Sequence, residues 1–114
     1  RVHRDPEDDP GAERALRRAL ALDPGEPGIL AGLGRVLLDL GRPDEAVDVL
    51  RAAVSARPAD AAAVAALGVA LHRTGDLAGA REWLDRAALL APDDELIRAS
   101  RELLDDVPPP AGAE

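Results

Sequence analysis

Proline and glycine recur along this chain at one fixed interval. Pro24, Pro58 and Pro92 are equally spaced, and the same interval separates Gly41 from Gly75. Proline ends a helix because it lacks a backbone donor, and glycine adopts the left-handed conformation that follows many helix ends. In a chain of 114 residues, enough for one small domain, this period predicts stacked copies of one helical unit.

The repeat is visible when residues 27–60 are aligned with residues 61–94 without gaps. In each unit an apolar face recurs at i, i+3, i+4 and i+7, and Leu33, Gly34 and Leu37 lie on the first of these faces. A glycine in mid-helix weakens the helix, so we expect it to admit a neighbouring helix closely. Ten aligned pairs are identical: Ala31/Ala65, Leu33/Leu67, Gly34/Gly68, Leu37/Leu71, Gly41/Gly75, Ala46/Ala80, Leu50/Leu84, Ala53/Ala87, Pro58/Pro92 and Asp60/Asp94.

The residue types favour helices throughout. Alanine and leucine are the two most frequent residue types, and both are strong helix formers. No stretch alternates apolar and polar residues with the period of two that a half-buried strand requires. We therefore expect an all-α fold in which the periodic glycines end the first helix of each unit and the periodic prolines end the second. Asp60 and Asp94 stand where helix N-caps are expected.

This pattern resembles the tetratricopeptide repeat family, whose unit is a 34-residue helix–turn–helix. The pairs Leu33-Gly34 and Leu67-Gly68 match the family's Leu-Gly pair. Leucine and valine fill the aromatic positions of the first helix, at Leu30, Leu37, Val64 and Leu71. The second-helix positions that match are Ala46, Leu50, Ala53 and Pro58, then Ala80, Leu84, Ala87 and Pro92. The resemblance implies a right-handed α-α superhelix, that is, a helical solenoid.

The resemblance also implies how the chain is divided. We expect two full repeats flanked by a half-repeat and a capping helix, with residues 1–9 either an acidic arm or the tail of a missing helix. The repeat domain is expected over residues 10–107, with a half-repeat at 10–26, repeats at 27–60 and 61–94, and a capping helix at 93–107. After this domain we expect a flexible proline-rich tail at 108–114.

The capping helix departs from the strict period. A shift by one full repeat would place Arg98, Arg101 and Glu102 at core positions. Sliding the register back by two residues instead predicts an inner face of Leu96, Ala99, Ser100 and Leu103, extended by Leu104 and Val107. The opposite face would then be charged, as the exposed end of a repeat stack requires.

The composition excludes several classes of function. The chain has a formal charge of −8, all 14 of its cations are arginines, and Trp83 is its one aromatic residue. Such a chain lacks the basic surface and stacking rings of a nucleic-acid binder. It has no cysteine for a zinc site, and no apolar run approaches the length of a membrane span. We therefore predict no nucleic-acid partner, no membrane association, and no cofactor or metal.

The sequence offers no catalytic constellation either. His3 and His72 are the two histidines, and Ser55, Thr74 and Ser100 are the three hydroxyl side chains. None of the hydroxyl residues stands in a nucleophile-elbow motif. We therefore expect that this chain is not an enzyme. Arginine without lysine, with the alanine and leucine excess, is typical of a GC-rich genome and favours a bacterial source.

The first helix of each repeat lines an inner groove in this family. The groove positions of this chain are mostly small and apolar, and Gly28, Ala31, Gly32 and Ala62 share this face. Arg35 and Arg73 can each bind a carboxylate with two parallel hydrogen bonds, so we expect them to anchor a ligand. The candidate residues for binding a peptide or partner are Arg35, Leu38, Asp39, Ala65, Ala66, Val69, His72 and Arg73.

Family members that hold the acidic C-termini of chaperones use a clamp of Lys, Asn and Arg side chains. This chain has neither Lys nor Asn, and Ala31, Arg35 and Ala66 occupy the corresponding positions. The resemblance therefore does not extend to a chaperone-tail receptor.

We expect a non-enzymatic scaffold or interaction module that binds a peptide or partner protein in the groove. We also expect the chain to be part of a larger protein, and a cytoplasmic location is the default expectation. One alternative is self-association into a homodimer, because a lone helix at residues 10–22 would expose an apolar stripe of Ala12, Leu16, Ala19 and Leu20. Another alternative is an accessory domain of a multidomain enzyme.

Overall fold

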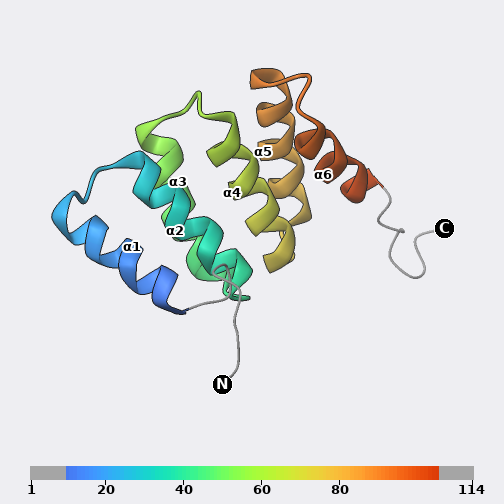
Figure 1. The fold of residues 1–114 in the computed structure, drawn as a ribbon. Helices are drawn as coiled ribbons and strands as arrows, with labels where there is room; N and C mark the ends of the chain where they lie inside the picture. Colours follow the sequence, from blue (N-terminus) through green and yellow to red (C-terminus); the bar gives the residue numbers. More distant parts are fainter. Residues whose placement is uncertain (1–9, 106–114) are drawn as a thin grey trace.

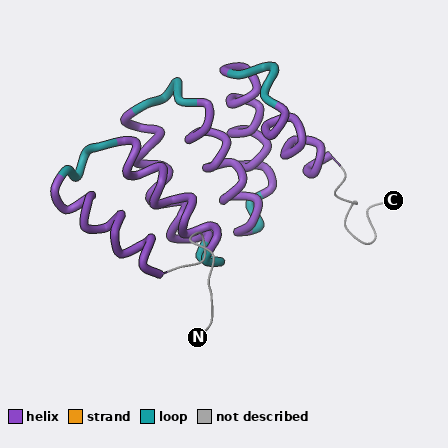
Figure 2. The backbone as a smooth tube through the Cα atoms, in the orientation of Figure 1, coloured by secondary structure: helices purple, strands orange, loops and turns teal. Residues whose placement is uncertain are grey.

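A computed structural model of the chain describes residues 10–105 (Figure 1). This part folds into six α-helices and contains no strand (Figure 2). Each helix packs against the next in the chain, and α2 also contacts α4, so the first helices of successive repeats lie side by side. The predicted helical solenoid is confirmed. The helices are α1 (Pro10–Leu22), α2 (Pro27–Asp39), α3 (Pro43–Ala56), α4 (Ala61–Thr74), α5 (Leu77–Leu90) and α6 (Glu95–Asp105).

The turns follow the periodic residues. Gly41 and Gly75 have φ angles of 79° and 97°, in the left-handed region that glycine enters without strain. Each glycine ends the first helix of a repeat and turns the chain into the second. Asp60 caps α4 by accepting hydrogen bonds from the backbone N–H groups of Ala62 and Ala63, and Asp94 caps α6 in the same way.

Two glycines set the distance between the paired helices. Gly34 of α2 faces Leu50 of α3, and a Cβ added at Gly34 would lie 2.6 Å from the Leu50 Cδ2 atom. The same addition at Gly68 of α4 would lie 2.7 Å from the Leu84 Cγ atom of α5. Both distances are too short for a real Cβ, which confirms the close approach predicted from the repeat. The two leucines are fully buried and form the centre of each helix pair.

The capping helix buries Leu104, as the sequence predicted, but the rest of its buried face differs from the predicted one. Leu96 and Leu103 are 80% and 62% exposed, whereas Ile97 and Leu104 are buried. The register shift relative to the repeats is therefore one residue, not two. The physical reason lies in α5, which α6 contacts along the face that carries Ile97 and Leu104.

Two ion pairs fix the orientation of α6 on α5. Arg81 binds Asp105 at 2.7 Å, and Asp85 binds Arg101 at 3.0 Å. Arg81 and Asp85 of α5 thus both reach across to α6.

A cluster of four charged side chains joins α1 to the start of α3. Arg42 donates to Glu13 of α1 at 2.6 Å and to Glu45 of α3 at 2.7 and 2.8 Å. Arg17 of α1 binds Glu13 at 2.8 Å and lies 3.6 Å from Glu45. Hydrogen bonds from Arg42, and for Glu13 also from Arg17, hold the pKa of both carboxyls below the usual 4.5. Leu16 of α1 adds apolar contact with the core.

Gly34→Ala should lower the free energy of unfolding by about 1–3 kcal/mol, because the new methyl group collides with Leu50. Gly32→Ala is the matched control on the same helix, since its Cβ would meet Leu16 at an ordinary 3.6 Å. The control should gain up to about 1 kcal/mol from helix propensity. Urea unfolding followed by circular dichroism measures both, and equal stability of the two variants would contradict the packing role of Gly34.

The ion cluster should make stability depend on pH. Because the pKa of Glu13 is lowered in the folded chain, its contribution is complete above the usual pKa of 4.5 and is lost as pH falls through the lowered value. Wild type should therefore melt at a higher temperature than Glu13→Gln at pH 7, and the two should converge in acid. Glu102→Gln removes an exposed carboxylate outside the cluster and should track the wild type. Melting curves that differ by a constant amount at every pH would argue against the cluster.

Candidate functional site

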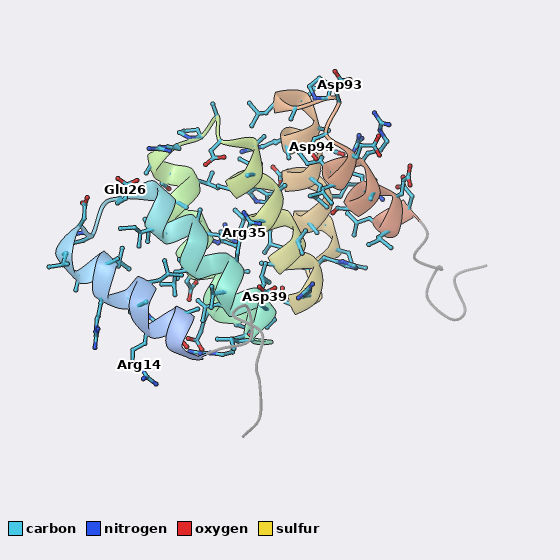
Figure 3. All side chains as sticks on the ribbon, viewed as in Figure 1. Arg14, Glu26, Arg35, Asp39, Asp93 and Asp94 are labelled. Atoms are coloured by element: carbon cyan, nitrogen blue, oxygen red, sulfur yellow. The ribbon has the colours of Figure 1, made fainter. Side chains whose placement is uncertain are left out.

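Three helices line a groove with a volume of about 350 Å³ on the described part of the chain. They are α2, α4 and α6, the first helix of each repeat and the capping helix (Figure 3). Seven of the eight candidate residues lie together in this groove. Its lining residues are Arg35, Leu38 and Asp39 of α2, Ala62, Ala65, Ala66, Val69 and Arg73 of α4, and Asp94, Leu96, Ile97 and Ser100 at α6.

The base of the groove is apolar. The residues that α4 contributes between its ends are three alanines and Val69, all with small side chains. Leu38 and Ile97 are buried beneath the two sides and connect the groove to the core.

The two arginines of the groove differ in their bonding. The Nη1 atom of Arg73 donates a hydrogen bond to the Leu38 carbonyl oxygen at 3.2 Å, next to the bond that this oxygen accepts from the Gly41 N–H group. Arg73 thus ties the end of α2 to α4. Arg35 is exposed, and within residues 10–105 it makes no hydrogen bond or ion pair. Arg35 is therefore the cation that is available to a ligand.

Carboxylates stand at the two ends of the groove. Asp39 lies one turn beyond Arg35 on α2, and Asp94 lies at the start of α6 (Figure 3). The Oδ1 atom of Asp94 accepts hydrogen bonds from the Leu96 and Ile97 N–H groups, at 2.9 and 3.2 Å. Asp94 is thus engaged in capping α6. The free positive charge of Arg35 lies between these two acidic ends.

Some predicted positions lie outside the groove. His72 is half-buried near the end of α4 and is not a lining residue, although its neighbour Arg73 is. Gly28, Ala31 and Gly32 also lie outside the lining, and Gly32 faces Leu16 of α1.

The residues that α6 contributes were missing from the candidate set. They are Asp94, Leu96, Ile97 and Ser100. The period itself carries a signal for two of them, since Leu96 and Ser100 lie one full repeat after Ala62 and Ala66. The register predicted for the capping helix turned Leu96 and Ser100 towards the core. For that reason neither residue was predicted to line the groove.

The sequence profile of the tetratricopeptide repeat matches this chain twice, over residues 10–61 and 31–95. The chain belongs to the tetratricopeptide repeat family. The two overlapping matches cover the helices from α1 to the start of α6. None of the helices in the tetratricopeptide domain between residues 10 and 105 has the length and apolar character needed to cross a membrane.

Curated relatives share this domain but are much longer. The mouse protein O-mannosyl-transferase TMTC1 is 31% identical over 108 residues, which cover 91% of this chain and 12% of that protein. Protein FlbA of Caulobacter vibrioides is 41% identical over 61 residues, which cover 54% of this chain and 10% of FlbA. The chain thus spans about an eighth or less of the curated relatives that it matches.

Solved structures with this fold include tetratricopeptide domains that carry peptides. The crystal structure of MamA is 27% identical, with a TM-score of 0.80, covering 92% of this chain and 66% of MamA. The first such domain of Spaghetti, bound to the HSP90 peptide SRMEEVD, is 16% identical with a TM-score of 0.78, covering 82% and 74%. The Yersinia enterocolitica chaperone SycD, in complex with a YopD peptide, is 17% identical with a TM-score of 0.75, covering 84% and 79%.

Arg73→Ala should lower the free energy of unfolding by about 1 kcal/mol, because it removes the charged hydrogen bond to the Leu38 carbonyl oxygen. Arg35→Ala is the control, since a side chain without a partner in the described chain should change stability by less than about 0.5 kcal/mol. Thermal unfolding of both variants gives the comparison. A larger loss for Arg35→Ala than for Arg73→Ala would show that the structural roles are reversed.

Proposed function

We propose that this chain is a non-enzymatic interaction module that binds a carboxylate-bearing peptide segment of a partner protein in the groove of α2, α4 and α6. Membership of the tetratricopeptide repeat family supports an interaction role. The peptide complexes of Spaghetti and SycD supply precedents for peptide binding on this fold.

The observation that carries the proposal is the exposed Arg35 beside an apolar surface. Arg35 projects from α2 into the region between α2 and α4 (Figure 3). A guanidinium without a protein partner can bind a carboxylate through two hydrogen bonds, and neighbouring apolar surface strengthens such a pair by excluding water. The chain's net charge of −8 makes this cation a local exception, so it favours an acidic group on the ligand.

The packing of α1 weakens the case for self-association through that helix. The apolar stripe of α1 was expected to lie open, but its four residues are half-buried, and Leu16 and Leu20 pack against the core. The ion cluster of Glu13 and Arg42 holds the same helix to α3. The surface that a second copy would need is therefore already partly covered within the chain.

Matched arrays of synthetic peptides test this function. Each peptide is printed once with Asp or Glu and once with the corresponding Asn or Gln, and labelled protein is bound to both. Wild type should prefer the acidic member of a pair, and Arg35→Gln should lose this preference, with about tenfold weaker binding.

Arg14→Gln is the matched control for this test. Arg14 is an exposed arginine that projects from α1 away from the groove (Figure 3). This variant changes the net charge by the same amount and should bind as the wild type does. If Arg35→Gln keeps the acidic preference, the partner binds elsewhere on the chain.

A further inference from the structure

A pocket of about 170 Å³ lies between α3 and α5 and shares no lining residue with the groove. Both helices pack against α4, but they do not pack closely against each other. The interior of the pocket is apolar because Val54 and Leu67 are buried, whereas its rim is polar and exposed. The lining residues are Arg51, Val54 and Ser55 of α3, Leu67 of α4 and Trp83 of α5.

The rim carries two hydrogen-bond donors that have no partner within residues 10–105. They are the guanidinium of Arg51 and the hydroxyl of Ser55, and Arg51 does not pair with Asp48 one turn earlier on α3. Arg51 and Ser55 are four residues apart in one helix, so their Cβ atoms lie about 5–6 Å apart on the same face. Both groups can therefore donate hydrogen bonds to one anion.

The residues that stand one full repeat away from Arg51 are both ion-paired. One repeat earlier stands Arg17, which binds Glu13 at 2.8 Å. One repeat later stands Asp85, which binds Arg101 at 3.0 Å. Among these three positions of the described chain, that of Arg51 is the one without a partner. The unpaired cation is therefore a feature of this pocket and not of the repeat.

The aromatic wall is also particular to this pocket. Trp83 is the one aromatic residue of the chain, and the two preceding units carry Val49 and Ala15 at its position. Arg86 lies over the Trp83 ring, 4.6 Å from its centroid, and also binds Glu82 at 3.3 Å. Because Arg86 is not a lining residue, it leaves open the part of the ring that lines the pocket. This part gains free energy when an apolar group covers it.

The pocket thus asks for a carboxylate and a bulky apolar group that lie close together. In an extended internal segment, successive side chains point to opposite faces, so an acidic side chain next to a leucine points away from it. The last residue of a protein carries its carboxylate and its side chain on the same Cα atom. A chain terminus therefore brings both groups to the rim and the interior at once.

We infer that this pocket binds the C-terminal residue of a partner protein. A large aliphatic side chain of that residue packs against Trp83 and Val54, and its terminal carboxylate accepts hydrogen bonds from Arg51 and Ser55. The inference does not depend on the function proposed for the groove, because the two sites have no lining residue in common. It gives the chain a second binding site on its outer helices.

The fluorescence of Trp83 reports directly on this pocket, because it is the one tryptophan of the chain. The full chain is titrated with the acetylated peptide Gly-Ser-Gly-Ser-Leu carrying a free C-terminal carboxylate. The same peptide with a C-terminal amide removes the charge, and a peptide ending in glycine removes the aliphatic group. The free acid ending in leucine should shift the emission saturably. The other two peptides should bind at least about tenfold more weakly, which corresponds to about 1.4 kcal/mol.

Arg51→Gln removes the cation with little risk to the fold, because Arg51 is exposed and has no partner in the described chain. This variant should bind the acid and the amide equally. Arg14→Gln makes the same change of charge on α1, outside the pocket, and should keep the preference of the wild type for the acid.

Several results would overturn the inference. They are an unchanged Trp83 emission, equal binding of acid and amide by the wild type, and a preference for the acid that persists in Arg51→Gln. A preference that Arg35→Gln abolishes would place the ligand in the groove instead. A helical peptide with an amidated C-terminus can also present leucine and glutamate on one face, four residues apart. Tighter, Arg51-dependent binding of such a peptide would show that the occupant is a helix and not a chain terminus.

Discussion

The close approach of two helices within each repeat is the contact on which the rest of this structure depends. Gly34 and Gly68 carry no Cβ, and the side chains of Leu50 and Leu84 occupy the space that a Cβ would take. A chain with a single aromatic residue has few large side chains with which to fill wide gaps between helices. Short distances between helices let leucine, valine and alanine reach the packing density that a folded core requires. The helices α2, α4 and α6 of this packed array line one groove.

Several polar groups of the groove also hold the helices together. Arg73 bonds to the end of α2, and Asp94 caps α6. These side chains already have partners, so a ligand gains less from them than their charges suggest. Arg35 differs because nothing in the described chain competes for it. Among the described lining residues, the groove thus carries one cation without a partner, Arg35 on α2, and one exposed leucine, Leu96 on α6.

The buried and groove-lining faces of α2 and α4 could be predicted because each helix has one apolar face. The residues that recur with the repeat period identify that face. The capping helix could not be predicted in this way. Its sequence carries leucine or isoleucine on two flanks, with Leu96 and Leu103 on one, and Ile97 and Leu104 on the other. Only the position of α5, with Arg81 and Asp85 reaching across to α6, decides which flank is buried. For the same reason the leucine side of the groove was not foreseen.

The sequence by itself determined the helical class, the repeating two-helix unit, the turns at Gly41 and Gly75, and eight of the residues that line the groove. These features depend on local conformation and on periodicity, which residues near one another in the chain specify. The tertiary structure alone decided that Arg73 is bonded while Arg35 has no partner among residues 10–105, that His72 lies outside the groove, and which flank of α6 faces it. These outcomes depend on contacts between residues far apart in the chain. Arg73 and Leu38, for instance, are 35 positions apart, and no local pattern specifies that meeting.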